Sequence, residues 1–282
     1  MTIEAQRADG LPMPAVGQAF SALEDGVHKV VVTADGEARH WRVKVRRDAP
    51  EDFFAAEAAG LDALREAGVL RVPEVFEVDR HYIALEDLGN GRASELDWAR
   101  AGAGLARMHG AGGDAFGFAQ DGYCGDSPQP NAWTADGNAF FAEHRLGHQA
   151  RLAVRRGLLG HADAERIEML GARLAELVPP TSAVLVHGDL WSGNLHACSS
   201  GELALIDGGA VHFGWAEADL AMLILFGEPP KAFFDAYREA SGVDADWRER
   251  APIYNLYHLL NHLNLFGESY LGSVRGVLDR FA

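Results

Sequence analysis

The sequence predicts an α+β fold with two lobes, a small antiparallel β-sheet lobe with one helix and a larger, mainly helical lobe. Three observations support this prediction. Strand-like segments dominate the first part of the chain, helical periodicity dominates the rest, and an acidic, glycine-containing segment over residues 86–91 separates them. We therefore predict an N-terminal lobe of residues 1–86 and a C-terminal lobe of residues 87–282.

The first lobe begins with a predicted hairpin. Residues 27–33 are rich in β-branched side chains, residues 34–37 have the composition of a turn, and residues 40–45 alternate apolar and basic side chains. After Pro50, apolar residues recur at helical spacing up to Gly68, which predicts one amphipathic helix. Residues 75–78 and 82–85 predict two further short strands.

The second lobe is predicted to be a series of helices separated by glycine-containing loops. Residues 183–186 and 203–206 have the length and composition of short strands, and we interpret them as one hairpin. Residues 117–133 show no regular pattern, and we interpret them as a long loop, a kind of segment that is often functional in compact domains. Helical spacing predicts helices over residues 96–108, 139–156, 163–177, 216–226, 231–241 and 253–266.

Composition limits the classes of function. The 282 residues carry 25 basic and 41 acidic side chains, and the net charge of −16 opposes binding to a phosphate backbone. Residues 1–10 have no apolar core of a signal peptide, and residues 220–226, the most apolar stretch, are too few to span a bilayer. Two cysteines cannot build a disulfide framework. We expect a cytoplasmic monomer that binds neither nucleic acid nor membrane.

A polar cluster from His187 to Asn194 has the spacing H-x-D-x-x-x-x-N, and Asp207 follows an apolar strand shortly afterwards. In the catalytic loop of kinases, this arrangement supplies an aspartate that accepts the substrate hydroxyl proton, and an asparagine and a second aspartate that bind Mg²⁺. Such hard oxygen ligands suit Mg²⁺. An isolated Asp-x-x-x-x-Asn usually only caps a turn, but His187, Gly188 and the second aspartate favour phosphoryl transfer here.

Phosphoryl transfer also requires a lysine on a strand of the first lobe and a glutamate on the helix that follows it. Lys44 and Glu57 fit by order and placement, although each alone would be an ordinary surface residue. The junction over residues 83–88 is placed to bind adenine through its backbone, and a plain interdomain linker is the alternative.

The run Leu185–Asn194, with the later Ile206-Asp207 and the segment from Glu217 to Met222, resembles the fructosamine/ketosamine 3-kinase family. That family shares the protein-kinase-like fold of the aminoglycoside and choline kinases. The resemblance extends over nearly the whole chain. Its most specific parts are Trp191-Ser192-Gly193 and the segment Gln129-Pro130-Asn131-Ala132-Trp133.

The resemblance implies an ATP-dependent, Mg²⁺-requiring kinase that phosphorylates a sugar hydroxyl, the C3 hydroxyl, of small ketosamines such as ribulosamines or fructosamines, in deglycation. It also implies a role for each residue of the motifs. Asp189 would be the catalytic base, Asn194 and Asp207 would hold Mg²⁺, Lys44 would contact the phosphates with Glu57 orienting it, the backbone near Glu86 and Leu88 would hold adenine, and Trp191 and His187 would lie on the substrate side.

Two departures from the family pattern leave alternatives open. Asp207-Gly208-Gly209 replaces Asp-Pro-Ala, so we expect a more flexible loop there. Residues 21–27 contain one glycine, two acids and no cysteine, which argues against cysteine-based redox control. The alternatives are a kinase of the aminoglycoside/choline phosphotransferase type and a catalytically inactive pseudokinase. The short segment between Asp207 and Glu217 lacks the Ala-Pro-Glu motif of protein kinases, so we expect a small substrate.

The remaining polar candidates receive structural interpretations. Asp219 lies at a helix start, and we predict that it hydrogen-bonds the catalytic loop. His258 and His262 are four residues apart on an apolar helix but lack the glutamate of the metalloprotease motif. We interpret them as a helix face near the substrate pocket, with core packing as the alternative, and we interpret Cys124 and Cys198 as unreactive thiols.

Overall fold

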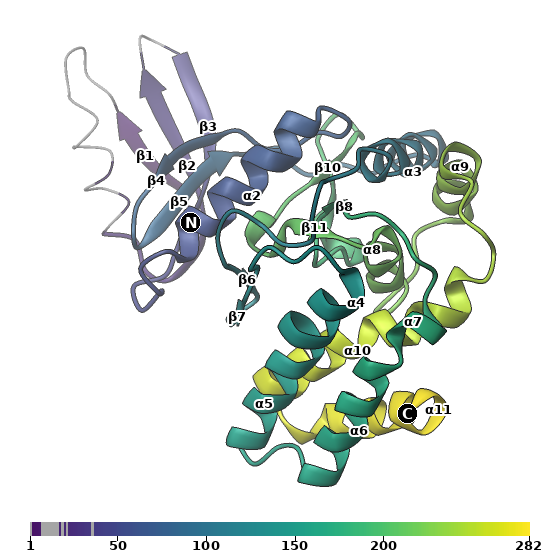
Figure 1. Ribbon diagram of the computed structural model, residues 1–282. Coiled ribbons are helices and arrows are strands. Elements are labelled where there is room, and N and C mark those ends of the chain that lie inside the picture. Colours follow the sequence, from purple (N-terminus) through teal and green to yellow (C-terminus); the bar gives the residue numbers. More distant parts are fainter. Residues whose placement is uncertain (1, 7–16, 18–19, 21, 35–36) are drawn as a thin grey trace.

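The computed structural model describes residues 2–6, 17, 20, 22–34 and 37–282, and it confirms the predicted α+β, two-lobed architecture (Figure 1). The sheet and one long helix come from the first part of the chain, and the helices of the second part lie on the other side of the molecule (Figure 1). The division after residue 86 stays a prediction. Within the described residues, no helix is long and apolar enough to cross a membrane.

The first lobe is a five-stranded sheet in the order β1-β2-β3-β5-β4. The predicted hairpin is confirmed as β2 (Gly26–Ala34) paired antiparallel with β3 (Glu37–Val45). The two further strands are β4 (Val75–Val78) and β5 (Tyr82–Glu86). An edge strand that the sequence pattern did not predict, β1 (Thr2–Gln6), runs parallel to β2.

Helix α2 (Phe53–Ala67) forms because its apolar residues recur on one face, and it ends at Gly68, whose positive φ of 66° suits glycine. Its buried side includes Phe54, Leu61 and Leu64, which belong to the main core of the protein. Glu57 lies on the same buried side, so the helix carries a charged group towards the interior.

The helical lobe contains helices in all the predicted regions, but the predicted helix over 163–177 is divided into two, and the one over 253–266 begins six residues earlier. A single turn of π-helix (Phe141–Gly147) joins α4 to α5, and a C-terminal helix was not predicted. The helices are α3 (Glu95–His109), α4 (Gly137–Phe140), α5 (His148–Arg155), α6 (His161–Ala172), α7 (Leu174–Leu177), α8 (Ala216–Leu223), α9 (Lys231–Ser241), α10 (Trp247–Phe266) and α11 (Leu271–Phe281).

The predicted pairing of the two short strands in this lobe is wrong. β8 (Val184–Val186) pairs with β11 (His212–Gly214), and β10 (Leu203–Leu205) pairs with β9 (Leu195–Ala197). The catalytic loop leaves β8 and continues directly into β9, so β10 folds back on its immediate predecessor. The long loop over residues 117–133 contains a further small hairpin, β6 (Gly122–Cys124) and β7 (Ser127–Gln129).

Two glycines allow α2 to approach the segment that follows Asp207. A Cβ on Gly60 would lie 1.9 Å from the carbonyl oxygen of Gly208, and a Cβ on Gly208 would lie 2.6 Å from the backbone nitrogen of Leu61. These close backbone contacts restrain Gly208, so the structure does not support the flexible loop that we expected at Gly208-Gly209. Gly208 begins a short 3₁₀-helix and is buried against α2.

We predict that Gly60→Ala destabilises the protein, although alanine normally favours a helix. The added methyl group overlaps backbone atoms of Gly208, so the free energy of unfolding should fall by about 1–3 kcal/mol. Gly276→Ala is the matched control, because Gly276 also lies within a helix but has nothing within 4 Å of an added Cβ. The control should gain about 0.5–1 kcal/mol, as measured by urea denaturation. Equal effects of both substitutions would contradict the close approach of α2.

Candidate active site

Asp219 at the start of α8 organises the loop that contains the kinase-like motif. Its buried carboxylate accepts hydrogen bonds from the backbone N–H groups of His187, at 2.7 Å, and Gly188, at 2.9 Å. Burial opposes the charged form, but the hydrogen bond from His109 and the loop contacts still hold the pKa of Asp219 below its ordinary value. The predicted structural role of Asp219 is confirmed.

Gly188 has a φ of 80°, and a Cβ at this position would lie 2.1 Å from the carbonyl oxygen of Ala210. The loop therefore needs glycine both for its backbone conformation and for its space.

His187 was predicted to lie on the substrate side, but the structure places its side chain in the interior. The ring is fully buried, and its Nε2 donates to the carbonyl oxygen of Ile206 at 2.7 Å. Its Nδ1 lies 3.4 Å from the backbone N–H of Asp189. His187 therefore joins the catalytic loop to the end of β10. Both of its ring nitrogens have partners within the protein, so neither is left for a ligand.

Asn194 and Trp191 occupy the far side of the same loop. The Nδ2 of Asn194 donates to the carbonyl oxygen of Asp189 at 2.8 Å, which leaves its Oδ1 for another partner. The indole of Trp191 covers Gly193, where a Cβ would lie 2.1 Å from the ring. Trp191 is 42% exposed and lines a cleft.

Lys44, Glu57 and Asp207 meet at the centre of the site although they come from β3, α2 and the segment after β10. The Nζ of Lys44 donates to Glu57 Oε1 at 2.6 Å and also to Asp207 Oδ1. Asp207 has a φ of 63°, the one positive φ of a non-glycine residue within the described chain. This rarely populated backbone conformation turns the carboxylate towards Lys44.

Two clefts meet at Asp207. One, of about 260 Å³, is lined by the loop and by residues of α2 and the 117–133 segment, namely Phe53, Glu57, Tyr123, Gly125, Asp189, Trp191, Asn194, Asp207, Gly209 and Ala210. The other, of about 310 Å³, is lined by Lys44, Asp207 and the predicted hinge segment from Leu85 to Leu88. The sequence pattern did not identify Phe53 and Tyr123, although it marked the loop that carries Tyr123.

The hinge segment is held by a buried carboxylate whose role was not predicted. Asp87 accepts hydrogen bonds from Arg42, at 2.9 Å, and from the backbone N–H of Gly89, at 3.2 Å. Burial opposes ionisation, but the Arg42 contact keeps the pKa of Asp87 below its usual value. The side chain of Glu86 pairs with Arg71. The carbonyl oxygen of Leu88 accepts from Ser199, whereas its N–H has no partner among the described residues.

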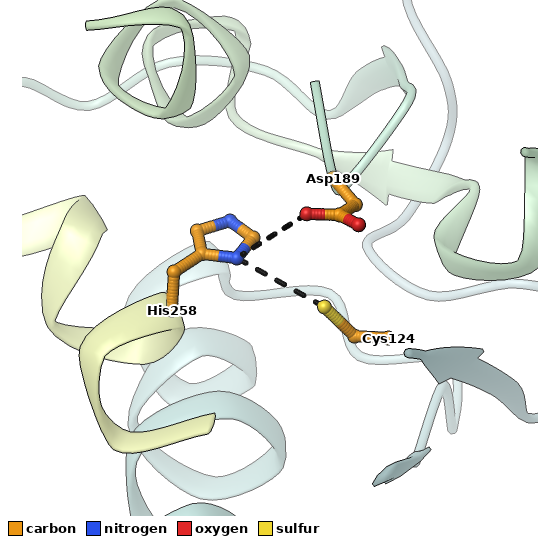
Figure 2. Close-up of side chains that lie close together, drawn as sticks. All are labelled: Cys124, Asp189 and His258. Atoms are coloured by element: carbon orange, nitrogen blue, oxygen red, sulfur yellow. Dashed lines mark hydrogen bonds and ion pairs between the residues drawn. The ribbon is translucent and has the colours of Figure 1, made fainter. Parts of the chain in front are cut away.

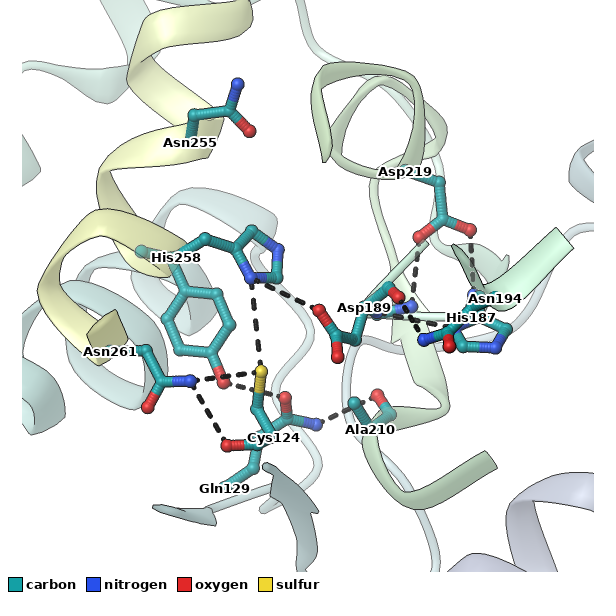
Figure 3. Close-up of polar contacts among 12 residues, drawn as sticks. Cys124, Gln129, His187, Asp189, Asn194, Ala210, Asp219, Asn255, His258 and Asn261 are labelled. Carbon is teal, nitrogen blue, oxygen red and sulfur yellow. Dashed lines mark hydrogen bonds and ion pairs between the residues drawn. The ribbon is translucent and has the colours of Figure 1, made fainter. Parts of the chain in front are cut away.

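The 117–133 segment is fixed to the core by a buried arginine of the π-helical turn. Arg145 donates to the carbonyl oxygen of Pro130 and to Asn131 Oδ1, both at 2.7 Å, and its guanidinium lies over the ring of Phe140. Burial lowers the pKa of Arg145 to about 10. Gln129 links the segment to the turn after Asp207 by donating to the carbonyl oxygen of Ala210 at 3.0 Å (Figure 3). Irregular helical turns of this kind are often found at functional sites.

Asp189 of the catalytic loop faces α10. Its side chain is 25% exposed, and its Oδ1 is 3.8 Å from Nδ1 of His258, which in turn is 3.9 Å from Sγ of Cys124 (Figure 2). Burial raises the pKa of Asp189 above its ordinary value, and burial lowers the pKa of His258 to about 3. His258 contacts Asp189 but is itself buried and does not line the cleft, so core packing fits its position as well.

The residues predicted to bind Mg²⁺ fit that ion. Asn194 offers a free carbonyl-type oxygen because its nitrogen is bonded within the loop. The side chain of Asp207 is 46% exposed and faces both clefts. Two hard oxygen donors from the protein, completed by water and substrate phosphates, are a common environment for Mg²⁺.

The chain is similar over most of its length to proteins of one family. The model of the fructosamine kinase family matches residues 13–282. A probable ketoamine kinase from Synechocystis is 41% identical over 251 residues, covering 87% of this chain and 84% of that protein. A chloroplastic protein-ribulosamine 3-kinase from Arabidopsis thaliana is 35% identical over 262 residues, covering 87% and 77%.

Solved structures extend the similarity to the fold. A Thermobifida fusca protein described as a fructosamine-3-kinase superposes with a TM-score of 0.80 at 35% identity, over 86% of this chain and 85% of that one. The aminoglycoside phosphotransferase APH(2")-IIa, solved with streptomycin and ATP, superposes with a TM-score of 0.60 at 15% identity over 96% and 97%, which shows a shared fold. This chain belongs to the fructosamine kinase family and has the protein-kinase-like fold of the aminoglycoside phosphotransferases.

Proposed function

We propose that this protein is an ATP-dependent, Mg²⁺-requiring kinase that phosphorylates the C3 hydroxyl of small ketosamines such as ribulosamines or fructosamines, in deglycation. The observation that carries the proposal is the meeting of two clefts at Asp207. One cleft carries the lysine and hinge expected for a nucleotide, and the other carries a carboxylate and an aromatic ring expected for a sugar acceptor.

In the proposed reaction the protein positions its reactants and balances their charge. The backbone around Glu86 and Leu88 binds adenine, with the N–H of Leu88, which is unpaired among the described residues, as a donor. Lys44, oriented by Glu57, binds the phosphates. Asn194 and Asp207 hold Mg²⁺, which neutralises charge on the transferred phosphoryl group when it is bound. Asp189 orients the sugar hydroxyl and accepts its proton.

The acceptor cleft favours a substrate that combines a sugar with an amine. Of its acidic lining residues, Glu57 and Asp207 pair with Lys44, whereas the carboxylate of Asp189 does not, and a protonated amine would be attracted to Asp189. Trp191 offers a partly exposed aromatic face on which a sugar or a cation can pack. The ordered contacts of Lys44, Asp189, Asn194 and Asp207 argue against an inactive pseudokinase.

A substrate panel tests the proposal. Purified protein with ATP and Mg²⁺ should phosphorylate ribulosamines or fructosamines with a higher kcat/KM than aminoglycosides or choline, and the product should carry its phosphate at C3 by NMR. Turnover of an aminoglycoside alone would support the phosphotransferase alternative. Absence of turnover and of any Mg²⁺-dependent ATPase activity, whether or not nucleotide binds, would support the pseudokinase alternative.

We predict that Asp189→Asn lowers kcat by about 10²–10⁴-fold, because the amide cannot accept the hydroxyl proton. The fold and ATP binding should be retained, as checked by thermal unfolding and by titration with ATP and Mg²⁺. Asp279→Asn is the control, since Asp279 is 71% exposed and paired with Arg166 on the surface. A near-normal kcat for Asp189→Asn would refute its role as the base.

We predict that Lys44→Ala lowers kcat/KM for ATP by at least about 10²-fold, because one charged donor to the phosphates is lost. Lys44→Arg should restore little, since the guanidinium cannot take the position of the ammonium between Glu57 and Asp207. Lys231→Ala, which breaks an exposed pair with Asp235, should leave the rate unchanged. Initial rates at varied ATP concentrations distinguish these outcomes.

A further inference from the structure

A cluster of three side chains behind the acceptor cleft has no part in the proposed reaction beyond Asp189 itself. Cys124 of β6, Asp189 of the catalytic loop and His258 of α10 place one ligand-type atom each within 4.8 Å of one another (Figure 2). Sγ of Cys124 lies 3.9 Å from Nδ1 of His258, and Oδ1 of Asp189 lies 3.8 Å from the same nitrogen. Three different segments of the chain therefore converge on one point.

These separations suit a tetrahedral ion. With metal–sulfur, metal–nitrogen and metal–oxygen bonds of about 2.3, 2.0 and 2.0 Å, tetrahedral ligand atoms lie about 3.3–3.6 Å apart. The two distances to Nδ1 of His258 exceed that range by a few tenths of an ångström, and the third separation lies within 4.8 Å. Side-chain movements of about 1 Å or less would bring all three atoms to that geometry. A thiolate and an imidazole select a borderline-soft ion such as Zn²⁺ over Mg²⁺. Three protein ligands leave the fourth position open for water, as in sites that exchange ligands.

The surroundings of Cys124 support a metal-bound thiolate. The Nδ2 of Asn261 donates to Sγ of Cys124 at 3.2 Å, and its Oδ1 accepts from Nε2 of Gln149 at 3.3 Å. Oε1 of Gln149 in turn accepts from Nδ2 of Asn264 at 2.8 Å. This chain of buried amides directs an N–H group, and not an oxygen, at the sulfur. Figure 3 shows the contact of Asn261 with Cys124. Hydrogen bonds of this kind orient and stabilise metal ligands.

We propose that Cys124, Asp189 and His258 form an inhibitory Zn²⁺ site. The bound ion coordinates the carboxylate of Asp189, which otherwise accepts the substrate proton. Binding forms one Zn–S, one Zn–N and one Zn–O bond and releases the thiol proton of Cys124 to solvent. The thiolate and the carboxylate together balance the charge of the ion, so the occupied site is neutral overall in a buried region. The inhibition, but not the binding, rests on the proposed function of Asp189.

Binding is tested without any activity measurement. Full-length protein, freed of metal with a chelator, is titrated with Co²⁺ and with Zn²⁺ in competition with a chromophoric chelator. The wild-type protein should bind one ion and show a thiolate-to-Co²⁺ charge-transfer band. Cys124→Ser and Cys124→Ala should each lose the band and bind Zn²⁺ at least about tenfold more weakly.

Cys198→Ser is the matched control, because Cys198 is the other buried thiol and lies in the turn between β9 and β10. It should keep both the band and the affinity. Thermal unfolding confirms that each variant is folded. A wild-type protein without the band, or folded Cys124 variants that keep it, would overturn the site.

Inhibition is measured with ketosamine substrate at free Zn²⁺ concentrations set by a metal buffer, since ATP itself binds zinc. Each variant is compared with its own rate without zinc. Wild-type and Cys198→Ser should be inhibited at least tenfold more strongly than the two Cys124 variants, and added ATP should not relieve the inhibition. Zn²⁺ binding at Cys124 without inhibition would overturn the inhibitory role. If the protein proves inactive on ketosamines, the Co²⁺ spectrum still reports metal binding. Failure of the proposed function can therefore be distinguished from failure of the proposed Zn²⁺ site.

Discussion

The ammonium group of Lys44 lies between the carboxylates of Glu57 and Asp207, and this contact joins the sheet, helix α2 and the segment after β10. Each partner constrains the fold around it. Glu57 requires α2 to present a charged side chain on its buried face, and Asp207 requires a backbone conformation that non-glycine residues rarely adopt. An uncompensated charge at this depth would be costly, so the three elements depend on one another.

Close backbone contacts hold the segments that carry Glu57 and Asp207 in the positions that their ion pairs with Lys44 need. Gly60 brings α2 against Gly208, Gly122 brings the 117–133 segment against Gly209, and Gly188 brings the catalytic loop against Ala210. All three contacts converge on the 3₁₀ turn that follows Asp207. The turn is therefore surrounded by backbone on several sides, which restrains a glycine-rich segment that would be mobile on its own.

The parts of the structure that could be predicted from sequence are those encoded by local patterns. The hairpin of β2 and β3 and helix α2 have clear periodicities, and the order of Lys44, Glu57, Asp189, Asn194 and Asp207 matches a known template. The pairing of β8 with β11 depends on contacts between distant segments, for which no local pattern exists. The buried position of His187 depends on the carbonyl oxygen of Ile206, and the approach of Cys124 to Asp189 depends on an unpredicted hairpin.

Lysine is scarce in this protein, and the ion pairs of its lysines affect how readily their amines can react with sugars. The chain has three lysines, and sugars with a free carbonyl group react with primary amines to form the adducts on which the proposed activity acts. Lys44 is largely shielded by Glu57 and Asp207, Lys29 is paired with Asp87, and the side chain of Lys231 is 84% exposed. Arginine carries most of the remaining positive charge. The protein therefore presents few lysine amines to reactive sugars, so it offers little target for the modification that it is proposed to reverse.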